Sequence, residues 1–181
     1  SDVLEWIYDT SSPSIEIEFP TGFNNSDETQ NADVTLTFIT DAATHFEESS
    51  ITITNGSVKQ NVINGENVST FQDIGLKEDD ASKRRYQATI TASEPVQTNQ
   101  SGKVNVTVKV DEEAFTDAAG NNNLASDELN WTYDSKAPTV GSITCTAKTY
   151  KIGETIEIGL VFTEDIVLTL DNDRKPKLTL N

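Results

Sequence analysis

The chain has 181 residues and a formal net charge of −17, because 30 Asp and Glu outnumber 13 Lys and Arg. This charge disfavours binding to nucleic acid or to an anionic membrane and favours cations as partners. No apolar run reaches the ~20 residues of a membrane-spanning helix. A single Cys and a single His exclude an internal disulfide and any metal site built on two imidazoles. The sequence has no Met and no apolar leader, so we expect a piece of a longer protein.

Short segments in which apolar and polar residues alternate predict half-buried β-strands along the whole chain. In chain order, these segments are residues 15–19, 34–38, 51–54, 86–92, 104–110, 129–133 and 156–158. Turn-forming pairs such as Asn55-Gly56 and Asn64-Gly65 lie between them, and no segment sustains helical spacing. The sequence therefore predicts an all-β protein, an antiparallel β-sandwich in which each sheet buries one face.

An internal repeat predicts how the chain is divided. Residues 1–13 align with residues 126–138 at an offset of 125, and seven of the aligned positions are identical. We therefore expect the last strand and linker of an upstream repeat in residues 1–13. A complete repeat should follow in residues 14–138, and a partial downstream repeat in residues 139–181.

Several blocks of the sequence, taken in order, resemble one family. Residues 115–121 (Phe-Thr-Asp-Ala-Ala-Gly-Asn), followed by a strand and by residues 133–140, resemble the closing signature of bacterial immunoglobulin-like tandem repeats. These repeats build large surface adhesins of the RTX or biofilm-adhesin type. Residues 44–58 resemble the middle of such a repeat, and residues 150–156 resemble its opening. The resemblance implies tandem immunoglobulin-like β-sandwiches at a cell surface, in arrays stiffened by calcium.

The repeat is longer than is usual for that family. The excess lies around residues 66–85 and includes a run of acidic and basic residues at 77–85. Because charged side chains are costly to bury, we expect this run to form a solvated loop.

Three residues are candidate ligands for calcium. Asp117 and Asn121 flank Gly120 in a stretch whose first interpretation is a tight turn. The alternative is that Asp117 or Asn121 supplies oxygen to a cation together with the linker residue Asp134, because Ca²⁺ accepts six to eight oxygen ligands. The resemblance favours this alternative. Residues 171–173 (Asp-Asn-Asp) are only a weak echo of a cation-binding loop.

Alternating aromatic residues raise the question of a sugar-binding face. Trp131 and Tyr133 share one face of a predicted strand, and Trp6 and Tyr8 do so in the upstream copy. A small sandwich uses such residues for core area, whereas a ligand face needs them outward and flanked by polar donors. We expect core packing.

Six Asn-x-Ser/Thr sequons are candidate glycosylation sites. They begin at Asn24, Asn55, Asn67, Asn99, Asn105 and Asn130. Asn105 and Asn130 alternate with apolar strand residues, so we expect their side chains on the solvent face.

The single cysteine and histidine are predicted to have structural roles. Cys145 lies in a strand-like stretch with no second Cys, so we expect it to be buried or half-buried. His45 has no accompanying nucleophile signature and is predicted to be a loop residue.

These observations predict a non-enzymatic surface protein, a tandem spacer and adhesive module with an extracellular, cell-surface location. A carbohydrate-binding module of a secreted protein is the alternative. A glycosidase is disfavoured because no long catalytic loops accompany the acids. Residues 139–181 hold too few strands for a sandwich. We therefore expect neighbouring repeats or neighbouring copies to complete them by strand addition.

Overall fold

The fold is all-β. The computed structural model describes residues 8–41, 43–95 and 102–166. The chain divides after Lys136 into a sandwich unit, residues 1–136, and a C-terminal unit, residues 137–181. Within the described residues the one helix is a 3₁₀ turn, η1 (Glu48–Ser50), which is far too short to cross a membrane.

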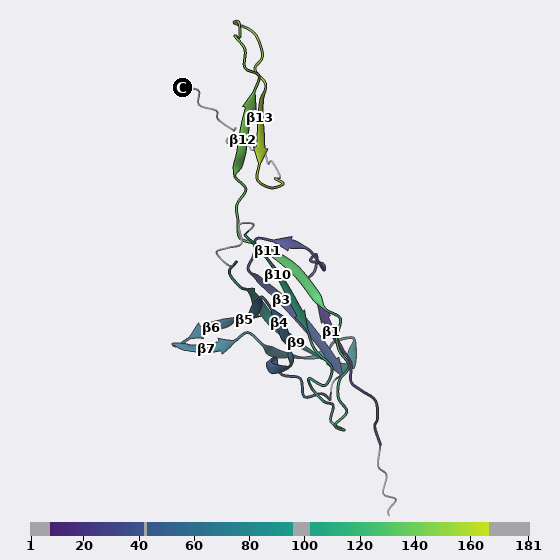
Figure 1. The fold of residues 1–181 in the computed structure, drawn as a ribbon. Helices are drawn as coiled ribbons and strands as arrows, with labels where there is room; N and C mark the ends of the chain where they lie inside the picture. Colours follow the sequence, from purple (N-terminus) through teal and green to yellow (C-terminus); the bar gives the residue numbers. More distant parts are fainter. Residues whose placement is uncertain (1–7, 42, 96–101, 167–181) are drawn as a thin grey trace, which may run out of the picture. The chain divides into compact units, whose positions relative to one another are not determined.

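The sandwich unit contains two sheets (Figure 1). The first sheet has the order β1 (Ile15–Glu18), β3 (Asp33–Asp41), β9 (Asp80–Ala92) and β5 (Gly56–Val58), with β8 (Gln72–Lys77) also paired to β9. The second has the order β2 (Glu28–Thr29), β11 (Leu129–Asp134), β10 (Lys103–Lys109) and β4 (Thr52–Thr54). The β2–β11 pair is parallel, and the other pairs in these two sheets are antiparallel.

The strand order is that of an immunoglobulin-like sandwich. Strands β1, β3, β9 and β5 occupy the positions A, B, E and D of one sheet, and β4, β10 and β11 occupy C, F and G of the other. The predicted fold class is therefore confirmed for this unit. The six predicted strands of residues 14–138 are also present, and the largest difference is that β9 begins six residues before its expected start at residue 86.

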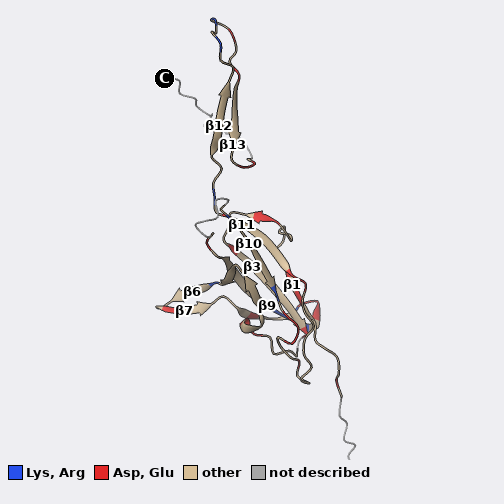
Figure 2. Ribbon diagram, in the orientation of Figure 1, with Lys and Arg blue, Asp and Glu red and all other residues tan. Residues whose placement is uncertain are grey.

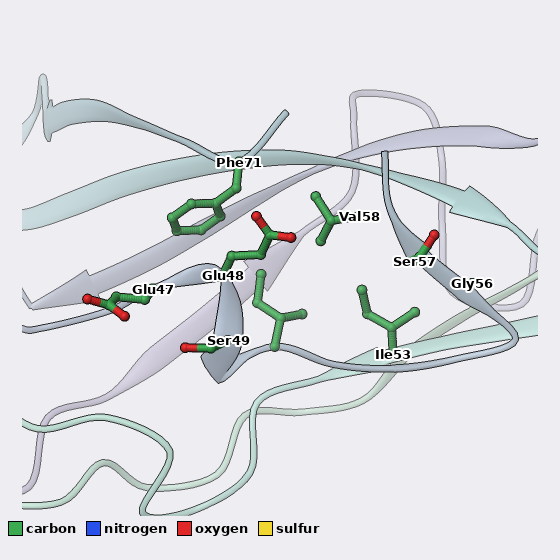
Figure 3. Close-up of a pocket in the computed structure, with 9 residues that line it drawn as sticks. Glu47, Glu48, Ser49, Ile53, Gly56, Ser57, Val58 and Phe71 are labelled. Atoms are coloured by element: carbon green, nitrogen blue, oxygen red, sulfur yellow. The ribbon is translucent and has the colours of Figure 1, made fainter. Parts of the chain in front are cut away.

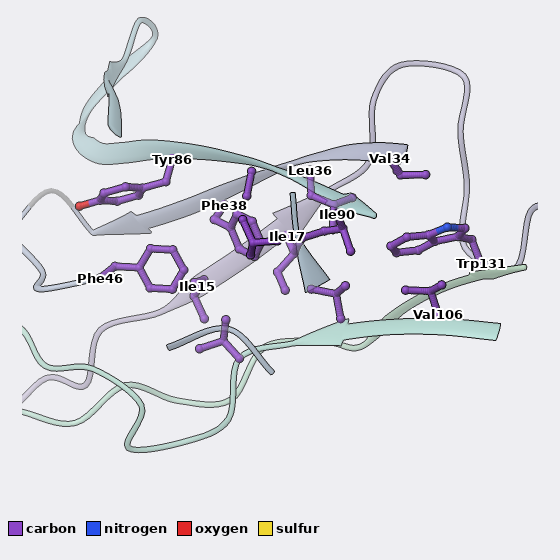
Figure 4. Packing of buried hydrophobic residues seen from close by; sticks show 14 of the residues in the cluster. Ile15, Ile17, Val34, Leu36, Phe38, Phe46, Tyr86, Ile90, Val106 and Trp131 are labelled. Carbon is purple, nitrogen blue, oxygen red and sulfur yellow. The ribbon is translucent and has the colours of Figure 1, made fainter. Parts of the chain in front are cut away.

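The core lies between the two sheets (Figure 4). On β3, Leu36 and Phe38 are fully buried, while Thr35 and Thr37, which alternate with them, are half-buried on the outer face. Val106 of β10 faces them from the second sheet and is also fully buried. Each such side chain contributes about 1.5–3 kcal/mol by leaving water, so the alternating pattern read from the sequence is the pattern that holds the sheets together.

A hairpin at residues 60–69 is inserted between two strands at one edge of the first sheet, and it overlaps the predicted excess of residues 66–85 only at residues 66–69. Strands β5 and β8 pair with different parts of β9, and the hairpin β6 (Gln60–Ile63)–β7 (Glu66–Ser69) projects between them (Figure 1). At its base, the Thr70 N–H donates to Lys59 O at 3.0 Å, and the Lys59 N–H donates to Thr89 O at 2.7 Å. The ladder on β9 therefore continues past the insertion.

The charged run at residues 77–85 is not a loop, which corrects the expectation from the sequence. Only its Glu78 and Asp79 form a turn, and the rest belongs to β8 and β9. Strand structure is tolerated because the bases find acids on neighbouring strands. Lys83 Nζ lies 2.6 Å from Asp41 Oδ1.

The described part of the C-terminal unit is a two-stranded antiparallel sheet, β12 (Val140–Cys145) and β13 (Ile158–Phe162). Its apolar side chains are open to solvent, with Ile143 60% and Leu160 47% exposed. Cys145 is exposed as well, so the expectation that it is buried was wrong. No second sheet covers these strands among the described residues.

Candidate functional site

The two linkers share one turn. The Ser11 N–H donates to Asp9 Oδ1 at 2.9 Å, and the Lys136 N–H donates to Asp134 Oδ1 at 2.9 Å. An aspartate that accepts from the amide two residues ahead is an Asx turn, which fixes the local chain direction. The aligned residues Asp9 and Asp134 therefore form the same kind of turn.

Hydrogen bonds hold the upstream linker, residues 9–13, to the strands and loops of the sandwich that follows it in the chain. Asn121 Nδ2 donates to Asp9 O at 3.1 Å, and the Leu124 N–H donates to Pro13 O at 3.1 Å. Pro13 is itself buried. The closing segment of the repeat thus holds the main chain that enters the same repeat.

A third contact holds the end of this linker. The Ser14 N–H donates to Asp41 Oδ2 at 2.9 Å, and Lys83 Nζ donates to Ser14 Oγ at 3.2 Å. The ion pair of Lys83 with Asp41 completes the group. It lies where β1 begins and β3 ends, because Ile15 pairs with Thr40.

The predicted residues Asp117 and Asn121 form a turn that satisfies its own polar groups. Asp117 Oδ1 accepts from the N–H groups of Ala119 at 2.9 Å and Asn121 at 2.8 Å. Asp117 Oδ2 accepts from Asn121 Nδ2 at 3.0 Å. The side-chain bond from Asn121 is the largest cause that lowers the Asp117 pKa. This is the tight turn that the sequence suggested, with Gly120 at a φ of +88°.

Asp134 lies at the start of the downstream linker and is 3% exposed. Burial acts to raise its pKa, but the Lys136 N–H and the Lys103 ammonium outweigh burial, so the pKa lies below its ordinary value. Asp134 Oδ2 lies 3.4 Å from Lys103 Nζ. The Ser135 N–H and Oγ both donate to Gly102 O at 3.1 Å. This linker is therefore held by the start of β10.

The three predicted calcium ligands are not brought together. Asp134 pairs with Lys103 at one end of the β10–β11 ladder, whereas Asp117 lies beyond Lys109 at the other end. Six residues of strand separate the two ends, about 20 Å. Across the described ranges, no group of three or more His, Cys, Asp and Glu could hold a metal ion. Calcium binding stays a prediction, and residues 171–173 lie outside the described residues.

One site residue was missed from the sequence. Asn123 is 2% exposed, and its Oδ1 accepts from the Phe115 N–H at 2.8 Å. Its Nδ2 donates to Asp111 O and to Leu124 O, both at 2.8 Å. The run Gly-Asn-Asn-Asn signalled only a turn, because three adjacent asparagines look alike until their burial is known.

Most Lys and Arg side chains in the described part of the sandwich unit form ion pairs. Asp and Glu are spread over strands and loops, whereas Lys and Arg are few (Figure 2). The pairs in the sandwich unit are Lys59–Asp33, Lys77–Asp79, Lys83–Asp41, Arg84–Asp73, Lys103–Glu28, Lys103–Asp134 and Lys109–Asp111. The described surface therefore offers no basic patch to a polyanion.

A groove of about 760 Å³ opens between the edge strands β4 and β5. Figure 3 shows Glu48 reaching towards Phe71 and Val58, while Glu47 points away. The Glu48 carboxylate accepts from Ser69 Oγ. The lining residues are Glu47, Glu48, Ser49, Ile51, Ile53, Gly56, Ser57, Val58 and Phe71. None of these lining residues is Lys, Arg, His or Cys. The single histidine, His45, is an exposed loop residue, as predicted.

The alternating aromatics belong to the core, as predicted. Trp131 is fully buried and Tyr133 is 8% exposed. The Trp131 ring meets Phe19 edge-on at 6.0 Å between centroids. In the upstream copy, Tyr8 is 79% exposed and outside any strand, while Trp6 lies outside the described residues. The alternative of a sugar-binding face therefore has no exposed aromatic surface on β11.

The candidate sequons differ in accessibility. Asn130 is half-buried, and its Oδ1 accepts from Ser26 Oγ at 3.1 Å. It is therefore less open than the strand pattern suggested. Asn99 lies outside the described residues. The exposed sequon residues are Asn24, Asn55, Asn67 and Asn105.

Comparison with known proteins shows weak structural similarity and no match in sequence. The sequence matches no protein-family model and no curated protein. Among solved structures, it is similar to BcpA, the major pilin subunit of Bacillus cereus, with 12% sequence identity and a TM-score of 0.32. The match covers 67% of this chain and 40% of that one. The fold assignment therefore rests on the strand order of the sandwich itself.

Proposed function

We propose that this chain is a non-enzymatic spacer module of an extracellular surface adhesin or filament, built from tandem immunoglobulin-like sandwiches. The observation that carries the proposal is the fastening of both linkers. Main chain enters at Asp9–Ser14 under three hydrogen-bonded contacts and leaves at Asp134–Lys136 under further contacts. A spacer needs fixed directions at which the chain enters and leaves each domain, and these contacts fix both directions.

The linkers themselves favour a stiff array. Each ends in a proline, Pro13 and Pro138, which fixes φ and reduces the freedom of the chain. Tension applied along the chain would load β1 and β11, the first and last strands of the complete sandwich. Both are bonded along their length to partners in the sheets, so extension requires shear of those ladders.

Pulling on single molecules through both ends tests the spacer function. We expect one cooperative rupture for the sandwich unit, with little extension of the linkers before it. Gradual extension at low force would contradict a spacer. Binding to an array of glycans would instead favour the carbohydrate-binding alternative, for which the groove lined by Phe71 is the available surface.

Calcium is part of this proposal as a stiffening ion at the linkers, with Asp117 and Asn121 at one end and Asp134 at the other. A bound ion stabilises the folded chain by about 2.7 kcal/mol at a hundredfold excess over Kd. We expect the melting temperature to fall when a chelator is added. An unchanged melting temperature would remove calcium from the proposal and leave the spacer in place.

Completion of the C-terminal unit by other polypeptide is also proposed, either by neighbouring repeats or by neighbouring copies. Val140, Ile143, Leu160 and Val161 are each 47–60% exposed, and a two-stranded sheet is marginally stable alone. An added strand would cover them. Strong hydrogen-exchange protection of β12 and β13 in a monodisperse monomer of this chain would contradict the idea.

A further inference from the structure

The sequence contains two Asn-Gly pairs, and the structure holds them differently. Asn55-Gly56 joins β4 to β5, and Asn64-Gly65 is the tip of the β6–β7 hairpin. Both asparagines have left-handed backbone, with φ of 56° and 53°. Because the dipeptide and the backbone conformation are shared, the surroundings decide how the two pairs differ in reactivity.

The first pair is fastened to the sandwich. Asn55 Nδ2 donates to Asn105 O at 2.8 Å, and the Ser93 N–H donates to Asn55 O at 2.9 Å. Gly56 packs so closely on β9 that a Cβ there would lie 2.9 Å from Thr91 O. Rotation of this turn therefore requires broken bonds and displaced neighbours.

The second pair, Asn64-Gly65, lacks these restraints. Ile63 and Glu66 form the last pair of the β6–β7 ladder, which leaves Asn64 and Gly65 outside it. Both are exposed, and a Cβ on Gly65 would meet nothing within 4 Å. Among the described residues, the Asn64 side chain has no hydrogen-bond partner. A lone two-stranded hairpin opens readily.

We infer that Asn64 is a site of spontaneous deamidation, a modification that Asn55 resists. The Gly65 amide nitrogen loses its proton to a solvent base and attacks Asn64 Cγ. The bond between nitrogen and Cγ forms, the bond from Cγ to the side-chain nitrogen breaks, and ammonia leaves. Water then opens the succinimide ring at either carbonyl, which gives aspartate or isoaspartate at position 64. Water is the only co-reactant.

The modification acts on the hairpin and spares the sandwich. A new carboxylate appears beside Glu66, and isoaspartate lengthens the main chain where two successive positive φ angles form the turn. The base of the hairpin remains closed by the bond from the Thr70 N–H to Lys59 O. Deamidation should therefore open β6–β7 without unfolding the two sheets.

The test is peptide mapping of the folded protein after incubation in mildly alkaline buffer. Mass spectrometry follows both Asn-Gly peptides, and enzymatic methylation identifies isoaspartate. Each hydrogen bond slows the reaction by about fivefold, so the two bonds of Asn55 predict conversion about 25-fold faster at Asn64. Equal rates at the two sites, or a faster rate at Asn55, would overturn the inference.

Two controls separate structure from local sequence. In concentrated urea the two sites should convert at similar rates, because the dipeptide is the same and its surroundings are gone. A preference for Asn64 that persists in urea overturns the structural explanation. The variant Asn64→Gln should lose the conversion and keep the melting temperature, and continued ammonia release from the 63–66 segment would contradict the assignment.

Discussion

The sandwich unit and the C-terminal unit use the same sequence pattern with opposite results. On β3, Leu36 is fully buried, whereas Leu160 on β13 is 47% exposed. Both residues sit in strands that pair with an antiparallel neighbour. The difference is the presence of a facing sheet. Alternation therefore predicts a strand, and only a second layer converts it into a core.

The first way to break this comparison is a matched pair of leucine truncations. Leu36→Ala should lower the free energy of unfolding by about 2–5 kcal/mol, because it removes a fully buried side chain and leaves a cavity. Leu160→Ala should change it by less than about 0.5 kcal/mol. Urea denaturation followed by intrinsic fluorescence measures both. Comparable losses would mean that β13 is covered in solution.

Sequence patterning found six strands of the sandwich and missed its short or polar strands β2, β5 and β8 and the β6–β7 hairpin. The Asn64-Gly65 turn was visible, but its flanking runs are too short and polar to show alternation. The charged run at residues 77–85 suggested a loop because charged side chains are costly to bury, and some of its acid partners are distant in sequence. Asp41 and Lys83 meet only because β3 pairs with β9. Long-range pairing of this kind is invisible locally.

The candidate site was predictable by residue type and not by position. Asp117, Asn121 and Asp134 were chosen as oxygen donors, and they do lie at the turn and linker where polar contacts concentrate. Spacing along the chain could not reveal that an entire strand hairpin separates them. Asn123 holds the loop between β10 and β11 in place through its side-chain hydrogen bonds. Nothing in the sequence distinguishes it from its neighbour Asn122 before burial is known.

Asn123 offers the second test, and its neighbour is the control. Asn123→Ala leaves the buried Phe115 N–H and the half-buried Asp111 carbonyl without these hydrogen bonds, which costs about 1–3 kcal/mol. Asn122→Ala at an exposed position should cost less than about 0.5 kcal/mol. Thermal and urea unfolding of the two variants decide the matter. Equal stability would show that the closing loop is held by other contacts.

Acid unfolding tests one carboxylate in each unit, Asp134 in the sandwich unit and Glu154 in the C-terminal unit. The folded pKa of Asp134 is lowered, so the stability it contributes is complete above its ordinary pKa of about 3.9. That stability is lost as the pH falls through the lower folded value. Asp134→Asn should therefore reduce stability at neutral pH and flatten the acid-dependent loss.

The control lies in the C-terminal unit. Glu154 forms an exposed ion pair with Lys148 at 3.5 Å, so Glu154→Gln should change the free energy of unfolding by less than about 0.5 kcal/mol. Urea titrations across the acid range measure both variants. A flattened acid profile in Glu154→Gln, with none in Asp134→Asn, would reverse the roles that burial assigns to these two acids.

The smallest expected effect is local and tests the linker contacts. Asn121→Ala removes the bond to Asp9 O and one bond to Asp117, so the free energy of unfolding should fall by only about 0.5–1.5 kcal/mol. Amide exchange should be more sensitive. The Ser11 and Leu124 amides, which donate within and to the linker, should exchange faster in the variant, while β3 and β9 keep their protection. Unchanged exchange at both amides would mean that the upstream linker is held without the closing turn.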